Sequence, residues 1–435
     1  MELTIHPPID KLDEYVLQQL EESDLSEEQR ALAREIITTR DNFLVTGNAG
    51  VGKSHLLNWL RRFINLSVTA STGIAAIQIK GSTIHAFAGL GIGKQTAAQI
   101  VNSLAEKAFK YNDRTLRRLQ ECERLVIDEV SMLDADMLDL LEQVLMLARG
   151  REESFGGVQM IFIGDFLQLP PVTKKGPPKF AFTAESWQNA GVNVRLLTKV
   201  FRQQDEHFSA ILNKIRFGET DDEVFQFLKA RHKAVDTDPA HPPCILHTHN
   251  AGCEEKNLTE LARLPGEEVI LEATESSKHP NFASQIDKEC LAPQKLHLKL
   301  GARVMLLANY NLSRGLANGS LGVVQQISTT EVEVLFDNGE TCNVIESDYE
   351  LIRGDEVVAT RKQFPLRLAW AITIHKSQGM TIPKVEAHLA GCFAKGQSYV
   401  ALSRAKTAEG LFLRGGSANI EAHPKAVKFY QEHCR

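Results

Sequence analysis

The strongest constraint on this sequence is a glycine-rich segment, residues 47–54, which matches the pattern G-x-x-x-x-G-K-[ST]. The apolar residues 43–46 before it predict a buried strand, and leucines at helical spacing within residues 55–64 predict a helix after it. Glycines let backbone N–H groups crowd round an anion, and the start of a helix adds partial positive charge. This order of strand, loop and helix predicts an α/β fold that holds the phosphates of a nucleoside triphosphate.

Each residue of this loop is a candidate contact to the nucleotide. Lys53 is expected to reach the β- and γ-phosphates, and the Ser54 hydroxyl is expected to be a ligand of Mg²⁺. A glycine-rich turn without a ligand is the alternative interpretation, which the fitting strand and helix on either side disfavour. The predicted nucleotide-binding residues of the loop are Gly47, Asn48, Ala49, Gly50, Val51, Gly52, Lys53 and Ser54.

Strand-like runs alternate with helical patterns throughout residues 1–190. Apolar runs at 67–70, 125–127 and 158–163 follow the one at 43–46. Alternation of this kind requires a parallel sheet covered by helices, so we expect a first α/β domain here.

Two helices of this first domain have clear signals. Ser26, with Gln29 three residues later, forms a capping-box pattern that predicts a helix start. Apolar residues at helical spacing predict another helix over residues 132–147.

A second α/β pattern begins after about residue 190 and is interrupted by short strand-like runs. Asn338-Gly339, which follows an alternating apolar run, predicts a hairpin within this interruption. We therefore expect a small β-barrel over residues 295–359, inserted into a second α/β domain made of residues 191–294 and 360–435.

Composition excludes several classes of protein. The net charge of −6 argues against a protein coated in basic surface, although a groove needs only local Lys and Arg to bind nucleic acid. No apolar run approaches the length that spans a bilayer, and the first residues lack the features of a secretion signal. The 7 cysteines include no C-x-x-C pair, so neither a zinc site nor a disulfide framework is indicated. These observations predict a cytoplasmic protein without a membrane partner.

Two further strand ends carry side chains suited to ATP hydrolysis. Residues 125–127 are followed by Asp128, which suits Mg²⁺ ligation, and by Glu129, which suits activation of the attacking water. Gln168 follows the strand at 158–163 and is expected to sense the γ-phosphate or position water. An acidic strand end and a turn are the alternative interpretations when each feature is taken alone.

Two arginines in the second half complete the predicted catalytic set. Arg202 and Arg404 are candidates for neutralising charge on the transferred phosphate from across a cleft. Each one alone has an alternative interpretation as a surface ion-pair residue. The predicted catalytic residues are Lys53, Glu129, Gln168, Arg202 and Arg404.

These motifs occur in the order expected of a superfamily-one helicase. Within the motifs at 69–76 and 81–89, the stretches S-T-G-I-A-A at 71–76 and T-I-H-A-F-A-G at 83–89 are specific to one family within this superfamily. Together with the segment at 373–379 and the Arg404 segment, they resemble the Pif-one (petite integration frequency) DNA helicases, relatives of the RecD-type helicases. The resemblance spans residues 24–410.

The resemblance implies a motor that uses ATP and Mg²⁺ to move 5′-to-3′ on single-stranded DNA and to unwind duplex, forked or structured DNA. It implies two RecA-like domains, an SH3-like barrel and a short wedge insertion near residues 85–110. Gln29 would bind adenine, and Gln168, Arg202 and Arg404 would close on the γ-phosphate. We expect a monomeric motor, associated with the nucleoid of a bacterial or phage system, with a role in replication, repair or recombination.

The strand of DNA is expected to lie on hydroxyl, aromatic and basic side chains from both domains. Hydroxyls grip phosphates, and His85 and Phe87 offer faces for base stacking. Core packing of Phe87 and a structural role of His85 are the alternatives. The predicted DNA-binding residues are Ser71, Thr72, His85, Phe87, Thr373, His375, Lys376 and Ser377.

The wedge that splits the duplex is expected after Phe87, where Leu90 or Ile92 would stack on the terminal base pair. Two rival functions stay open at this point. One is a DNA-stimulated translocase that does not separate strands, and the other is a P-loop phosphotransferase that acts on a small molecule.

Overall fold

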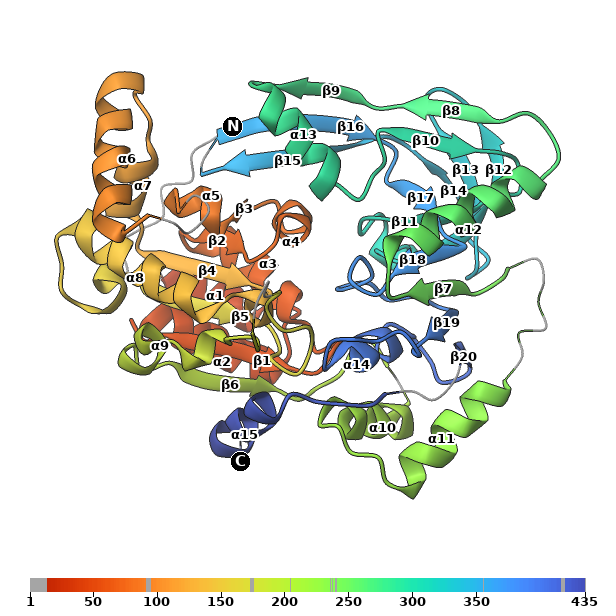
Figure 1. Ribbon diagram of the computed structural model, residues 1–435, viewed down its shortest axis with the longest axis horizontal. Helices are drawn as coiled ribbons and strands as arrows, with labels where there is room; N and C mark the ends of the chain where they lie inside the picture. Colours follow the sequence, from red (N-terminus) through yellow and green to blue (C-terminus); the bar gives the residue numbers. More distant parts are fainter. Residues whose placement is uncertain are drawn as a thin grey trace.

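The computed structural model describes the chain with short gaps, and its helices and strands form two lobes (Figure 1). The described residues are 14–90, 95–172, 176–203, 205–234, 236, 238, 241–354, 356–415 and 419–434.

The first lobe is built on a parallel sheet with the strand order β6-β1-β5-β4-β2-β3. Its strands β1 and β5 lie in the interior and are buried at every residue, as their continuous apolar sequences require. The predicted parallel sheet is therefore confirmed. The strands are β1 (Phe43–Gly47), β2 (Ser67–Ala70), β3 (Ser82–Thr83), β4 (Arg124–Asp128), β5 (Gln159–Ile163) and β6 (Asn193–Leu197).

Helices cover both faces of this sheet. Phe43 and Val45 pack against one cluster of apolar side chains while Leu44 packs against another, as the twofold alternation of a strand dictates. The helices and 3-10 turns of the lobe are α1 (Glu14–Glu21), α2 (Glu27–Thr38), α3 (Lys53–Phe63), α4 (Gly73–Gln78), α5 (Ile84–Ala88), α6 (Ala97–Tyr111), α7 (Thr115–Glu121), η1 (Val130–Met132), α8 (Ala135–Arg149), η2 (Ser154–Gly157), η3 (Ala181–Thr183) and α9 (Glu185–Asn189).

The two helix signals read from the sequence have different outcomes. The capping box is present at the start of α2, with both Ser26–Gln29 hydrogen bonds formed. The helix expected from residue 132 begins only at Ala135, because Asp134 caps it and a separate 3-10 turn precedes it.

The second lobe contains a smaller parallel sheet of order β18-β7-β19-β20. The predicted second α/β pattern is thereby confirmed. Its elements are α10 (Glu206–Arg216), α11 (Asp222–Lys233), β7 (Cys244–His247), α12 (Asn250–Arg263), β18 (Ala371–Thr373), β19 (Val385–His388), α14 (Gln397–Leu402) and β20 (Leu411–Arg414).

The insertion forms an antiparallel sheet of order β14-β13-β12-β11-β17 with its own apolar core. The predicted hairpin joins β13 to β14, and Gly339 takes the left-handed conformation in its turn. The elements are β11 (Arg303–Leu306), η4 (Leu312–Arg314), β12 (Leu321–Ile327), β13 (Val332–Phe336), β14 (Thr341–Val344) and β17 (Leu366–Leu368).

Strands on either side of this sheet connect it to the first lobe. β8 pairs with β10, and β9 pairs with β16, so the 269–277 segment, which lies in the range expected for the second α/β domain, pairs outside that domain's parallel sheet. β15 pairs with β16 and also meets β3 at Ile352–Ser82. The elements are β8 (Val269–Glu272), β9 (Thr274–Ser277), α13 (Pro280–Glu289), β10 (Lys295–Leu298), β15 (Ser347–Arg353) and β16 (Glu356–Gln363).

The expected wedge near residues 85–110 contains α5 and most of α6, which projects from the top of the first lobe (Figure 1). Leu90 is fully buried, so the expectation that it stacks on a base pair is wrong. Ile92 lies outside the described residues. The exposed aromatic side chains of this projection are Phe109 and Tyr111 at the end of α6, which are 93% and 78% exposed.

The C-terminal helix α15 (Pro424–His433) returns to the first lobe after the second sheet is complete (Figure 1). Phe429 and Tyr430 pack in the core of the first lobe. The Tyr430 hydroxyl lies 2.6 Å from the Thr46 hydroxyl and accepts a hydrogen bond from the Phe166 N–H at 3.1 Å. Among the described helices, none is long and apolar enough to cross a membrane.

We predict that Tyr430→Phe lowers the stability of the first lobe by about 1–3 kcal/mol, because the buried Phe166 N–H loses its acceptor. Urea unfolding followed by tryptophan fluorescence measures this as a lower midpoint. Tyr111→Phe changes the same group at an exposed position and should leave the midpoint unchanged. Equal midpoints for the two variants would show that the Tyr430 hydroxyl does not hold α15 in place.

Candidate active site

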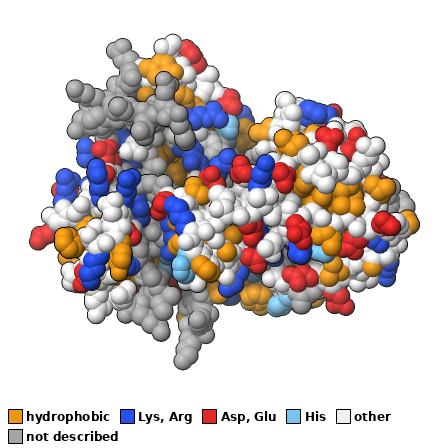
Figure 2. Space-filling model, turned by 90° about the horizontal axis from the view of Figure 1, so that it is seen from above, with side chains coloured by type: hydrophobic (Ala, Val, Ile, Leu, Met, Phe, Trp, Pro, Cys, Tyr) orange, Lys and Arg blue, Asp and Glu red, His pale blue; other side chains and the backbone are white. Residues whose placement is uncertain are grey.

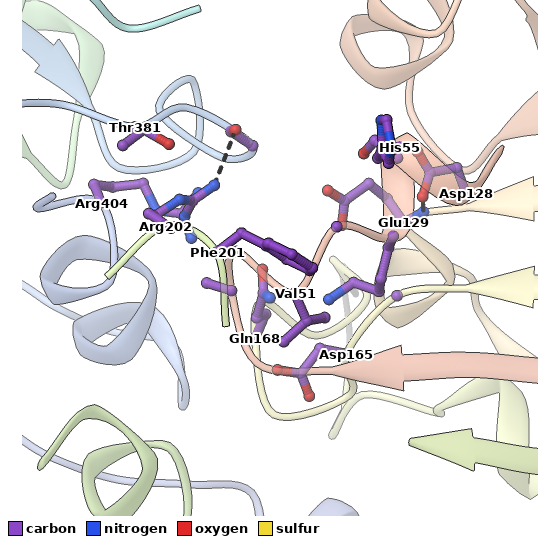
Figure 3. Close-up of a pocket in the computed structure, with 17 residues that line it drawn as sticks. Val51, His55, Asp128, Glu129, Asp165, Gln168, Phe201, Arg202, Thr381 and Arg404 are labelled. Carbon is purple, nitrogen blue, oxygen red and sulfur yellow. Dashed lines mark hydrogen bonds between the residues drawn. The ribbon is translucent and has the colours of Figure 1, made fainter. Parts of the chain in front are cut away.

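A cleft of about 340 Å³ lies between the lobes, and side chains from both lobes line it (Figure 3). The cleft brings together most residues predicted to bind and hydrolyse the nucleotide. Those that line it are Ala49, Gly50, Val51, Gly52, Lys53, Ser54, Asp128, Glu129, Gln168, Arg202 and Arg404. Gly47, Asn48 and Gln29 are not among the lining residues.

The glycine loop has a conformation that only glycine adopts easily at two places. Gly50 and Gly52 have φ values of 87° and 81°, and a Cβ on Gly50 would lie 2.3 Å from Cβ of Arg202. The Lys53 ammonium donates to the carbonyls of Gly47 at 2.7 Å and Asn48 at 3.1 Å. Burial lowers the pKa of Lys53 to about 8, because the charged amine has lost water. A phosphate would replace that lost hydration.

Gln29 of α2 is hydrogen-bonded to the backbone of the glycine loop. Its amide nitrogen donates to the carbonyls of Val51 and Gly52, and its amide oxygen accepts from the Ser26 N–H. The side chain is buried and both of its polar atoms are engaged. Its predicted contact with adenine would require these bonds to rearrange, and that contact stays a prediction.

The two carboxylates follow β4 at the edge of the cleft. Glu129 has a left-handed backbone, φ 52°, and its N–H donates to Oδ1 of Asp128 at 2.9 Å. Burial raises the pKa of both carboxyl groups, and the charge of Asp128 raises that of Glu129 further. A raised pKa suits a carboxylate that must take a proton from water.

Asp165 also lines the cleft, although the sequence analysis gave it no role. Arg216 of α10 donates to both of its carboxylate oxygens at 2.9 Å, and the pair is almost fully buried. Burial alone would raise the pKa of Asp165, but the Arg216 charge and hydrogen bonds outweigh burial and hold it below its usual value. The position of Asp165 directly after a buried strand was the only sequence signal for this role. Its partner Arg216 could not be identified from the sequence because it lies 51 residues away.

The Arg202 and Arg404 side chains lie across the cleft from Asp128 and Glu129 (Figure 3), although the backbone of Arg202 is in contact with Gly50 of the glycine loop. Arg202 donates to the carbonyls of Ser403 at 3.1 Å and Gly379 at 3.3 Å. Arg404 is buried and donates to the Val400 carbonyl at 2.9 Å. Burial lowers the pKa of both guanidinium groups. An anion between the lobes would therefore restore favourable interactions to both.

Tyr399, which the sequence analysis did not single out, contacts the glycine loop from the second lobe. It belongs to α14 of the second lobe, and its hydroxyl accepts a hydrogen bond from the Ala49 N–H at 3.1 Å. Gly396, at the start of α14, lies so close to the Gln168 carbonyl that a Cβ would be 2.4 Å from its oxygen. The second lobe thus contacts both the glycine loop and the Gln168 loop directly.

Several predicted DNA contacts have other roles in the structure. Phe87 is in the core of the first lobe, with the Arg118 guanidinium over its ring, so it cannot stack on a base as expected. The Ser377 side chain is fully buried and donates to the Ile374 carbonyl, which also contradicts a direct contact. Thr373 is buried as well, and its hydroxyl accepts from the Lys376 N–H.

The other predicted DNA contacts keep accessible surface. Ser71 donates to the Glu129 carbonyl, and Thr72 caps α4, so their hydroxyls already have partners. His85 is half-buried in α5, and burial lowers its pKa. His375 and Lys376 are half-buried in the second lobe.

An exposed aromatic ring lies beside His375. Phe393 is 67% exposed, and its ring stacks on that of His375 with centroids 6.3 Å apart. The ring of His249 lies 5.7 Å from the same phenyl group. The sequence signal for this cluster was weak, because its three residues come from separate loops.

The cleft offers oxygen ligands to a hard cation without enclosing it. Ser54 is exposed at the start of α3 and Asp128 ends β4, and both line the cleft. Within the described residues, no group of three or more His, Cys, Asp or Glu side chains forms a metal cage. This donor set fits Mg²⁺, which keeps several waters and binds through one or two protein oxygens and substrate phosphates.

The fold and the cleft together define a P-loop protein of two α/β cores, with two arginines across the cleft from the carboxylates that follow the phosphate loop in the chain. Residues 24–226 match the family model PIF1-like helicase, and residues 281–327 match the model DNA helicase Pif1, 2B domain. The chain is 42% identical over 416 residues to the ATP-dependent DNA helicase PIF1 of Homo sapiens. The match covers 93% of this chain and 63% of the human protein.

A bacterial relative matches over nearly its whole length. The chain is 34% identical over 421 residues to the ATP-dependent DNA helicase Pif1 of Bdellovibrio bacteriovorus, covering 96% of this chain and 94% of the relative. The chain therefore belongs to the PIF1-like helicase family.

Solved structures agree with this assignment. The chain is similar to Bacteroides sp Pif1 in complex with ADP-AlF4, with a TM-score of 0.81, 31% identity, and coverage of 95% of this chain and 98% of that one. It is also similar to Bacteroides Pif1 bound to ssDNA, with a TM-score of 0.62, 32% identity, and coverage of 94% and 97%. The predicted mixed α/β fold with two RecA-like cores is thereby confirmed.

We predict that Tyr399→Phe weakens nucleotide binding about 3- to 10-fold, because the Ala49 N–H loses its acceptor and the loop is less well held. Titration with a fluorescent ATP analogue measures this. Tyr310→Phe is the matched control, since the Tyr310 hydroxyl also accepts a backbone N–H at 3.1 Å, but in the insertion. If both variants bind the nucleotide as the parent protein does, Tyr399 does not support the loop.

Proposed function

We propose that this protein is an ATP-driven DNA helicase that moves 5′-to-3′ on single-stranded DNA and separates strands ahead of it. The observation that carries the proposal is the arrangement of Arg202 and Arg404 across the cleft from Lys53 and Glu129. A cleft of this kind closes when a triphosphate binds and reopens when the γ-phosphate leaves. Cyclic closure of two cores is what converts hydrolysis into movement.

Each cleft residue has a role that its position supports. Lys53 and the N–H groups of the glycine loop bind the phosphates, and Ser54 and Asp128 would hold Mg²⁺, which supplies charge neutralisation there. Glu129 orients water and takes its proton. Gln168 contacts the γ-phosphate from the first lobe and the arginines contact it from the other side of the cleft, which makes hydrolysis depend on closure.

The track for DNA is proposed to pass over the second lobe beside Phe393, His375 and Lys376. An exposed phenyl ring next to two histidine rings suits base stacking, which tolerates any sequence. Lys376 supplies a positive charge for a phosphate. Phe393 thus replaces Phe87 as the stacking residue of the hypothesis.

Charge on the outer surface is consistent with local contacts to DNA. In the view from above, acidic side chains are mixed with Lys and Arg on the right of the molecule. Lys and Arg side chains are more numerous on the left (Figure 2). The net charge of −6 means that the protein as a whole does not attract the DNA backbone. Binding is therefore expected to depend on a few phosphate contacts and on stacking.

Strand displacement tests the proposed function. Partial duplexes with a 5′ or a 3′ single-stranded tail are mixed with the protein, Mg²⁺ and ATP, and release of the labelled strand is measured. Release from the 5′-tailed duplex alone is expected, and Lys53→Ala should abolish it because the phosphates lose their charged partner.

Other results of this assay would contradict parts of the proposal. Release from only the 3′-tailed duplex would overturn the polarity. DNA-stimulated hydrolysis without release would favour a translocase that does not separate strands. Hydrolysis that DNA does not stimulate would refute a DNA motor and favour the phosphotransferase. Action as a monomer stays a prediction that sedimentation on DNA would test.

We predict that Phe393→Ala weakens binding to single-stranded DNA at least about fivefold, since stacking is worth about 1–3 kcal/mol per base. Fluorescence anisotropy with a labelled oligonucleotide measures this. Phe225→Ala removes another exposed phenyl group, on α11, and should bind DNA normally. Phe393→Trp should retain affinity, and equal weakening by the Phe225 and Phe393 variants would remove Phe393 from the track.

A further inference from the structure

One hydrogen bond joins the two lobes at the residue assigned to activate water. The Gln378 amide nitrogen donates to Oε2 of Glu129 at 2.7 Å. Gln378 belongs to the second lobe, in the turn of residues 374–380 that follows β18. Gln378 does not line the cleft, and the mechanism proposed above gives it no role.

The backbone of Glu129 is held in place independently of this bond. Its N–H donates to Asp128, and its carbonyl accepts from the Ser71 hydroxyl at 2.6 Å and from the Met132 N–H at 3.1 Å. Only the side chain is left to change orientation. Gln378 therefore determines where the carboxylate points.

The 374–380 turn also engages both arginines. The Gly379 carbonyl accepts from Nη2 of Arg202 at 3.3 Å, and the Ser377 and Met380 carbonyls accept from Nη1 of Arg404 at 3.5 and 3.4 Å. Glu129, Arg202 and Arg404 are therefore all hydrogen-bonded to this one turn.

The same turn carries side chains that face away from the cleft. His375 stacks on the exposed Phe393, and Lys376 lines a separate hollow of about 420 Å³ together with Arg367 and Lys295. A displacement of the turn by a ligand on that side would be transmitted to Gln378 within two or three residues. Few residues separate the two sites, so no long pathway is needed.

We propose that Gln378 is a positioning residue that holds the Glu129 carboxylate idle until single-stranded DNA engages the 374–380 turn. This inference rests on the proposed function and adds its regulation, namely how DNA stimulates ATP hydrolysis. DNA that contacts His375 and Lys376 shifts the turn, the Gln378–Glu129 bond breaks, and the carboxylate turns to the attacking water. Arg202 loses the Gly379 carbonyl in the same movement and becomes available to the phosphate.

The identity of the side chain fits this role. A glutamine amide donates to a carboxylate without carrying charge, so the bond can break without leaving a buried cation unpaired. A lysine at the same position would form a stronger ion pair and resist release.

The test compares steady-state ATP turnover of the parent protein and Gln378→Met, each without DNA and with saturating oligo-dT. Methionine keeps the length of the side chain and removes the donor, and Gln378→Ala serves as the second variant. We expect turnover without DNA to rise about tenfold, which corresponds to about 1.4 kcal/mol of activation free energy. Turnover with DNA should stay within about twofold of the parent, and the KM for ATP should not change.

Gln18→Ala is the matched control. Its amide donates to the Glu22 carboxylate at 2.8 Å on the surface of α1, so the same bond is removed far from the cleft. This variant should show the turnover of the parent with and without DNA.

The possible results separate the inference from the proposed function. If turnover of both Gln378 variants falls by the same factor with and without DNA, Gln378 supports the active arrangement or the fold, and the inference is wrong. An unchanged ratio of the two rates would also overturn it while leaving a DNA-stimulated ATPase intact. If DNA does not stimulate the parent protein, the proposed function fails, and the inference fails with it.

Discussion

The buried ion pair of Asp165 and Arg216 is the interaction on which the arrangement of this protein depends most. Its side chains are 0% and 3% exposed, and loss of one partner from such a pair typically costs about 3–5 kcal/mol. Asp165 follows β5 and Arg216 ends α10, while the Tyr430 ring lies 4.8 Å from the guanidinium group. One charge pair therefore fixes the loop of Gln168, the helix beyond the linker and the returning C-terminal helix against each other.

The sequence predicted the elements whose signals are local. The phosphate loop, the strand ends with Asp128 and Gln168, and the capping box at Ser26 depend on residues within a few positions of one another. The parallel sheet followed from continuous apolar runs, because such strands are buried on both faces. The cleft was predicted only because the phosphate loop with Lys53 was considered together with Arg202 and Arg404, which lie far along the chain.

The features that the sequence did not predict depend on distant contacts. Phe87 in a family motif suggested stacking on DNA, but its side chain is buried in the core of the first lobe, with Arg118 of α7 over its ring. β8 and β9 were grouped with the second core because the partners of an exposed strand cannot be read from its own residues. Tyr399, Gln378 and Arg216 gain their roles only where the lobes meet.

The return of α15 has a mechanical consequence. The chain leaves the first lobe after β6 and continues into α10, and α15 brings it back from the second lobe, with both helices at the lower edge of the molecule (Figure 1). Two tethers on one side form a hinge, so the lobes rotate about that edge and do not slide past each other. The contact of β15 with β3, through Ile352 and Ser82, lies on the opposite side of the molecule, so a rotation about the lower edge displaces it more than the contacts near α10 and α15 (Figure 1).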